Sequence, residues 1–191
     1  MKTQNIMIIG VGGQGSLLAS KLLGRLLMNE GYDVKVSEVH GMSQRGGSVV
    51  TYVRYGDKVA SPVIDTGEAD YIVSFEILEA ARWLGYLSPD GVVITNTQQI
   101  EPMPVITGAA SYPENLADKM ISTGAKVDAF DALELAVEAG SSKAVNIVLM
   151  GRLSKLFSLP ESAWLKAIEE SVPPRFLELN KKAFELGRSA G

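Results

Sequence analysis

Two glycine-rich segments carry the residues whose types and spacing are best suited to chemistry. The first, Gly10-Val-Gly12-Gly13-Gln14-Gly15, follows a short apolar run and precedes a helical pattern, and its spacing satisfies G-x-G-x-x-G. Glycines there permit a tight turn and let backbone N–H groups approach a phosphate at the helix N-terminus. The segment therefore predicts an anion-binding turn, although close packing of a strand against a helix requires the same glycines.

The second segment, residues 39–47, has the sequence Val-His-Gly-Met-Ser-Gln-Arg-Gly-Gly and no apolar period, which predicts a loop. Arg45 offers five donors in a rigid fork suited to a carboxylate or phosphate, and neighbouring residues add neutral donors. Two such loops at the carboxyl edge of a sheet would form an anion cradle. The predicted ligand- or partner-facing residues are Gly10, Gly12, Gly13, Gln14, Gly15, His40, Ser43, Gln44, Arg45, Gly46 and Gly47, and none is assigned as catalytic.

Simpler roles compete with these interpretations. Arg45 is also suited to an ion pair with Glu38 or another carboxylate that holds the loop. His40 is more typical of a hydrogen-bonded loop residue than of a general base. Ser43 has no visible base except His40, which argues against a nucleophile. The methionines at positions 28, 42, 103 and 150 are expected to serve packing.

The glycine turn admits more than one fold-level interpretation. Glu38 lies 23 residues after Gly15, near the end of a predicted strand, where a dinucleotide-binding fold has its ribose-binding acid. A nicotinamide- or flavin-binding oxidoreductase that acts alone is therefore one alternative. A turn that only shapes the backbone is another. The adenylating fold of ubiquitin-activating-type enzymes has a similar double glycine, but many of those enzymes also use a cysteine.

The surrounding pattern predicts an α/β chain. Apolar or β-branched runs predict strands at 5–9, 33–38, 48–55, 70–75, 91–95 and 126–129. Helical periods occupy 15–30, about 76–86, 113–123 with Pro113 at the first helical position, and 142–157. A capping box at Ser158–Glu161 and a Pro173-Pro174 pair open two further helices. We expect one domain over 1–191: a doubly wound, mostly parallel, Rossmann-like sheet, helical from about residue 131.

Composition excludes several classes of protein. The 191 residues contain no cysteine and one histidine, so the chain supplies no thiolate for an iron–sulfur cluster or zinc. A net charge of −4 argues against nucleic acid as a partner. No apolar run approaches the roughly 20 residues that span a bilayer, and the N-terminus lacks a signal-peptide pattern. These features predict a cytoplasmic protein without a membrane partner.

Several motifs together resemble a known family. They are Gly12-Gly-Gln-Gly15, then Glu38-Val-His-Gly-Met-Ser-Gln-Arg-Gly-Gly47, then Ser61-Pro62 ahead of Gly67-Glu-Ala-Asp70, with Asn146 and Gly151 later. This arrangement resembles the γ-type subunit of pyruvate and ketoacid:ferredoxin oxidoreductases. The version with His40, Gly41 and Met42 looks most like the small subunit of indolepyruvate ferredoxin oxidoreductases. The resemblance is strongest over residues 8–75.

The resemblance implies a division of labour between chains. A larger partner subunit would carry thiamine diphosphate and [4Fe-4S] clusters, decarboxylate the 2-oxoacid and pass electrons to ferredoxin. Coenzyme A, the acyl acceptor, is a candidate co-substrate at the loops of this chain, which would bind no cofactor and be inactive alone. A stand-alone NAD(P) or FAD oxidoreductase and a pure scaffold remain the alternatives.

Overall fold

The computed structural model describes residues 2–40 and 47–190, the side chain of His40 excepted. Its strands are β1 (Gln4–Val11), β2 (Asp33–His40), β3 (Ser48–Gly56), β4 (Ala69–Ser74), β5 (Leu87–Asn96) and β6 (Lys126–Phe130). They form one sheet in the order β2-β3-β1-β4-β5-β6. Within the described ranges, β3 runs opposite to the other five strands, which are parallel to one another. The predicted mostly parallel α/β sheet is confirmed.

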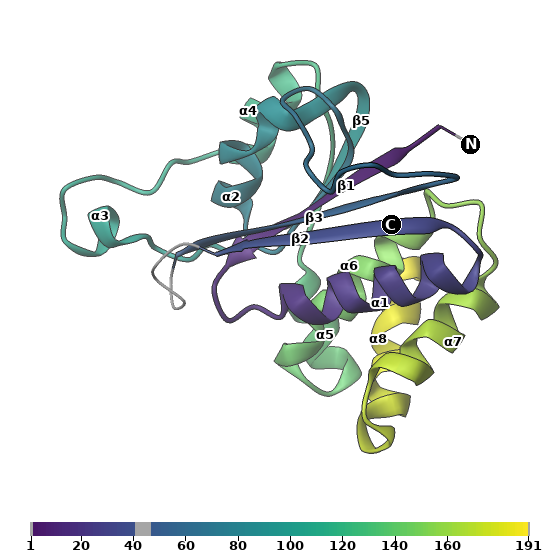
Figure 1. Cartoon of the computed structure of the whole chain (residues 1–191). Helices are drawn as coiled ribbons and strands as arrows, with labels where there is room; N and C mark the ends of the chain where they lie inside the picture. The colour runs from purple at the N-terminus through teal and green to yellow at the C-terminus, as the bar shows by residue number, and fades with distance from the viewer. Residues whose placement is uncertain (1, 41–46, 191) are drawn as a thin grey trace.

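Helices cover both faces of the sheet. They are α1 (Ser16–Asn29), α2 (Ile77–Arg82), α3 (Met103–Ile106), α4 (Leu116–Ser122), α5 (Ala132–Ala139), α6 (Val145–Ser154), α7 (Glu161–Ser171) and α8 (Leu177–Ser189), with 3-10 turns η1 (Leu84–Tyr86), η2 (Ser142–Ala144) and η3 (Pro174–Phe176). Figure 1 shows α1 and the C-terminal helices on one face and α2 and α4 on the other. None of the helices in the described ranges is long and apolar enough to cross a bilayer.

Strand β1 lies inside the sheet and is buried on both faces, which explains its unbroken apolar run. Ile6 and Ile8 pack with α1 and the C-terminal helices in one core. Met7 and Ile9 alternate with them and pack in the second core, beneath α2 and α4. The glycine turn therefore follows a strand that is buried on both faces of the sheet.

Only helices follow β6 in the described part of the chain, as the sequence predicts. Helices α6 and α8 meet at glycines, because a Cβ at Gly151 would lie 2.2 Å from the carbonyl oxygen of Phe184 and one at Gly187 only 2.0 Å from that of Val148. Backbone lies against backbone at this crossing. Gly151 therefore belongs to the packing of the C-terminal helices.

Two predicted helix starts are wrong. Helix α4 begins at Leu116, after Asn115 in the left-handed region (φ 54°), so Pro113 lies before the helix. Asparagine tolerates this conformation and turns the chain into the helix. The predicted capping box is also wrong, because Pro160 is the N-cap of α7 and no side chain caps it. The fixed φ of Pro160 starts that helix instead.

The first two strands do not form a simple adjacent pair. β2 runs in the same direction as β1, but β3 lies between them and is antiparallel to both. The sheet therefore differs from the usual dinucleotide-binding order, in which the second strand is beside the first.

Candidate functional site

The glycine turn joins β1 to the N-terminus of α1, and its glycines are required by backbone geometry. Gly13 and Gly15 have φ of 101° and 90°, a region that side chains rarely adopt. A Cβ at Gly10 would lie 2.9 Å from Oε1 of Gln14 and 3.0 Å from Cβ of Phe75. Gly15 is the N-cap of α1 and offers no side chain, so the first N–H groups of the helix are not capped by one.

Gln14 holds the turn in shape. Its Oε1 accepts a hydrogen bond from Val11 N at 2.8 Å, and its Nε2 donates to Phe75 O at 3.2 Å and to Oε1 of Gln98 at 3.4 Å. These bonds join the turn to the ends of β4 and β5. Gln14 thus fixes the shape of the turn, and it also lines a pocket at this edge of the sheet.

Buried amides support the same edge from behind. Asn96 is fully buried, donates to Phe75 O at 3.2 Å and accepts from Ala132 N at 3.1 Å. Asn146 donates to Gly15 O at 3.3 Å. Both amides connect the carboxyl edge to the helices that follow β6, so the geometry of the turn depends on the C-terminal part of the chain.

The second glycine-rich segment returns to the first. Gly12 N donates to Gly47 O at 2.9 Å, so the end of the second segment lies against the glycine turn. The remaining predicted residues of this loop, Gly41 and Met42 included, lie outside the described part of the chain. They are Ser43, Gln44, Arg45, Gly46 and the side chain of His40.

A pocket of about 490 Å³ opens beside the glycine turn. Its lining comes from Gly13, Gln14, Gly15, Gln98, Ile100, Leu133, Ser142, Lys143 and Val145. Exposed Lys143 supplies a cation opposite the N-terminal end of α1, an arrangement suited to an anionic group. Sequence reasoning missed Lys143 and Gln98, because neither belongs to a motif and both come from segments far from the turn.

Two buried carboxylates, Glu76 and Glu79, lie at the start of α2. Glu79 is 2% exposed and accepts from Ser48 Oγ at 2.5 Å and from Arg82 at 2.6 Å. Glu76 is 1% exposed and caps α2 by accepting from Glu79 N at 2.8 Å. Glu79 therefore fastens β3 to α2 directly after the predicted loop. Only the tertiary fold brings these acids to the site.

A family model described as pyruvate ferredoxin/flavodoxin oxidoreductase matches residues 5–190. The chain is 48% identical to indolepyruvate oxidoreductase subunit IorB of Thermococcus kodakarensis over 195 residues, covering 100% of the chain and 96% of the relative. It is 39% identical to IorB of Archaeoglobus fulgidus, covering 96% of the chain and 92% of the relative.

The chain belongs to the pyruvate ferredoxin/flavodoxin oxidoreductase family.

Solved structures share the fold of this chain. Subunit PORC of pyruvate oxidoreductase from Thermotoga maritima matches with TM-score 0.74 and 22% identity, covering 98% of this chain and 96% of that one. A 2-oxoglutarate:ferredoxin oxidoreductase from Magnetococcus marinus matches with TM-score 0.72 and 19% identity, covering 99% of this chain but 31% of that one. The fold of this family member thus also occurs as part of a longer polypeptide.

The position of Glu38 argues against the dinucleotide interpretation for this family member. Glu38 in β2 pairs with Thr51 in β3, which pairs with Ile8 in β1. Since neighbouring strands lie about 4.8 Å apart, the backbone of Glu38 is roughly 10 Å from β1. It is also level with Ile8, two residues before Gly10. A ribose-binding acid would stand on the strand beside β1.

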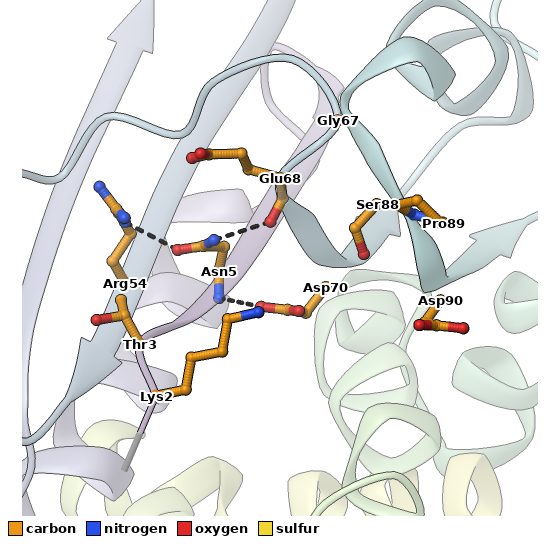
Figure 2. Close-up of a pocket in the computed structure, with 10 residues that line it drawn as sticks. All are labelled: Lys2, Thr3, Asn5, Arg54, Gly67, Glu68, Asp70, Ser88, Pro89 and Asp90. Carbon is orange, nitrogen blue, oxygen red and sulfur yellow. Dashed lines mark hydrogen bonds between the residues drawn. The ribbon is translucent and has the colours of Figure 1, made fainter.

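A second pocket, of about 450 Å³, lies at the opposite edge of the sheet (Figure 2). Asn5 joins its walls: the backbone N donates to Asp70 Oδ2, the side chain donates to Glu68 O, and Arg54 donates to Asn5 Oδ1, each at 2.8 Å. Arg54 also donates to Ser61 O and Val63 O. Asn5 of β1 and Arg54 of β3 therefore bind the motif residues Ser61, Glu68 and Asp70, at the edge opposite to where parallel sheets bind ligands.

Neither an iron–sulfur cluster nor a metal ion has a set of ligands among the described residues of this chain. Iron–sulfur clusters are held mainly by cysteine thiolates, and the sequence contains none. Within residues 2–40 and 47–190, no group of three or more acidic, histidine or cysteine side chains is arranged to hold a metal ion. The residues of this chain therefore do not fit an iron–sulfur cluster, and those in the described ranges do not fit a metal ion.

Proposed function

We propose that this chain is the small, cofactor-free subunit of an indolepyruvate ferredoxin oxidoreductase, which decarboxylates aryl pyruvates oxidatively in the cytoplasm. The observation that carries the proposal is the 48% identity to a subunit named IorB over the whole chain. In this reaction the 2-oxoacid loses carbon dioxide, electrons pass one at a time to ferredoxin, and the acyl group is transferred to the thiol of coenzyme A.

The chain has no activity alone and works within a hetero-oligomer. Because it contains no cysteine, the [4Fe-4S] clusters must be held by another polypeptide. A larger subunit carries the clusters and thiamine diphosphate, and it reduces ferredoxin. The Magnetococcus marinus relative supports this view, because the present fold corresponds to only 31% of that chain.

Within the complex, the carboxyl edge binds the anionic part of coenzyme A. The glycine turn exposes backbone N–H groups at the start of α1, Lys143 adds a cation, and the pocket between them has a volume of about 490 Å³. Arg45, whose planar fork suits phosphate, is the further donor that the sequence supplies near Gly47. This combination favours a phosphate-bearing co-substrate over an uncharged one.

The assembly is tested by purifying the tagged chain from its host without oxygen. We expect a larger, cysteine-rich, thiamine-containing protein to accompany it. The complex should reduce ferredoxin only when an aryl pyruvate and coenzyme A are both present. Oxidation of a substrate with a nicotinamide by the isolated chain would contradict the proposal.

The role of the carboxyl edge is tested by Arg45→Ala and Lys143→Ala in the complex. Each should raise KM for coenzyme A by roughly tenfold, which corresponds to the loss of one charge-assisted hydrogen bond. Lys166→Ala is the matched control, since Lys166 is exposed on α7 away from the pocket. Unchanged KM in both site variants would remove the loop and the pocket from coenzyme A binding.

A further inference from the structure

The connection between β5 and α4 forms an arm, here residues 97–115. Its regular structure is limited to the four-residue helix α3. Figure 1 shows α3, which lies within this connection, apart from both helical layers. Connections of this length in a compact domain are uncommon and usually serve binding or catalysis.

One buried carboxylate holds both legs of the arm. Oε1 of Glu76 accepts from Ile100 N at 3.2 Å on the outgoing leg and from the Tyr112 hydroxyl on the returning leg. Burial, together with this hydrogen bond, raises the pKa of the Tyr112 phenol, which therefore stays protonated as a donor. Hydrogen bonds to Glu76 therefore hold the base of the arm against the rest of the chain.

The tip of the arm is apolar yet internally bonded. Met103 is 66% exposed and Ile106 is 60% exposed, so the expected packing role of Met103 is wrong within this chain. Ala110 N donates to Pro104 O at 3.0 Å and Thr107 Oγ1 donates to Met103 O at 2.9 Å, which closes the tip. A shaped, exposed apolar element of this kind is typical of a surface that another chain covers.

The base of the arm is continuous with the candidate site. Gln98 accepts from Nε2 of Gln14 in the glycine turn, and Ile100 lines the same pocket as Gly13. A polypeptide that contacts a ligand held in this pocket would therefore lie beside the base of the arm. The arm contains two acidic residues, Glu101 and Glu114, and no basic residue, and Glu101 is the one charge near its tip. The occupant is therefore an apolar protein surface, and anionic lipid, which basic residues attract, is disfavoured.

We propose that the apolar tip of the arm, around Met103 and Ile106, inserts into an apolar recess of the larger subunit and fixes that subunit over the carboxyl edge. This inference rests on the proposed function, which supplies the larger subunit as the partner.

The test compares two double variants of the tagged chain, each co-expressed with the larger subunit. Met103→Asp/Ile106→Asp places charges on the tip. Met28→Asp/Ile121→Asp is the matched control, because these residues have the same types and are 57% and 50% exposed on α1 and α4. We expect the arm variant to retain roughly tenfold less of the larger subunit, and the control to retain the wild-type amount.

The outcomes separate the inference from the proposed function. If the wild-type chain itself retains no larger subunit, the proposed function fails. If the wild type and the arm variant retain equal amounts, or the control loses as much as the arm variant, the arm is not the docking element and the proposed function stands. Oligomers of the isolated chain that only the arm variant abolishes would identify a second copy as the occupant and overturn the inference.

A milder variant protects the test against a folding defect. Met103→Ser/Ile106→Ser removes apolar surface without adding charge, and should lower retention of the larger subunit less than the aspartates do. Thermal unfolding of each isolated chain is the accompanying measurement, with midpoints expected close to that of the wild type. Full retention by a folded serine variant would also overturn the inference.

Discussion

The two edges of the sheet present polar residues in opposite ways. At the amino edge, Asn5, Arg54 and Asp70 bond to one another and to neighbouring backbone, so their hydrogen-bonding capacity is used within the chain (Figure 2). At the carboxyl edge, Gln14 holds the glycine turn and Glu76 holds the arm. The backbone donors of the turn, the side chain of Lys143 and the apolar tip of the arm remain exposed there.

This contrast shows that pocket size does not identify a site. The two pockets have similar volumes, about 450 and 490 Å³. The two pockets lie at opposite ends of the parallel strands. The carboxyl ends of such strands lead toward helix N-termini and the long connections between elements. The amino edge is therefore suited to structural bonding, and the carboxyl edge to binding.

The largest effect should come from the base of the arm. Glu76→Ala leaves Glu79 N, Ile100 N and the Tyr112 hydroxyl without their acceptor and should lower the free energy of unfolding by about 3 kcal/mol. Urea unfolding of the chain is the measurement. Glu114→Ala, an exposed acid near the end of the arm, is the control and should change stability by less than about 0.5 kcal/mol.

Substitution at the amino edge, around Asn5, should lower the stability of the chain without changing turnover. Asn5→Ala removes the acceptor of Arg54 Nε and the donor to Glu68 O, and should cost about 2 kcal/mol of stability. In the assembled complex, KM for coenzyme A should remain at the wild-type value. A clear rise in KM for this variant would erase the distinction between the two edges.

Substitution in the glycine turn should have a smaller effect on stability and a larger effect on KM for coenzyme A. Gln14→Ala removes the acceptor of Val11 N and the donor to Phe75 O, for a loss of about 1 kcal/mol. Because the turn then loses its shape, KM for coenzyme A should rise by roughly tenfold, equivalent to about 1.4 kcal/mol. Steady-state kinetics beside the Asn5 variant decide the comparison. A loss of stability without a change in KM would make the turn purely structural.

The smallest effects should appear as opposite pH dependences. The raised pKa of Tyr112 means that its contribution to stability is complete below about pH 10, its ordinary value, and is lost as the pH rises further. At the amino end of β2, hydrogen bonds from Lys35 and from Val59 N lower the pKa of Asp33 below its ordinary 3.8. Its contribution is therefore complete above that value and is lost as the pH falls through the lowered pKa.

Unfolding midpoints measured across pH test both signs. Tyr112→Phe should flatten the alkaline loss of stability and leave the acid limb as it is. Asp33→Asn should flatten the acid limb alone. If a variant and the wild type have identical profiles, the pKa of the substituted group does not differ between the folded and unfolded chain.

Strands and most helices could be predicted because their signals are local. The run Asn5–Ile9 is apolar at every position after the first, and β1 contains it. The period from Leu18 to Leu27 predicts α1 to within a residue or so at each end. Pro113 and Ser158 misled the prediction, since proline and serine signal a nearby turn but do not specify the first helical residue.

The candidate site could be predicted only in part. The glycine turn and Gly47 follow from spacing, and the bond between Gly12 and Gly47 brings them together as expected. Lys143, Glu76 and the arm could not be predicted, because each depends on a contact between segments distant in sequence. The displacement of Glu38 by β3 was likewise invisible, since pairing between strands leaves no local pattern.

The amino-acid sequence alone determined the family motifs, the α/β class and the absence of cysteine ligands, because these depend on residue identity and short-range spacing. Tertiary structure alone decided which residues line the pocket at the carboxyl edge, which acids are buried and where apolar side chains remain exposed. Those properties arise from strand order and packing, in which residues far apart in the chain share hydrogen bonds that no single segment encodes.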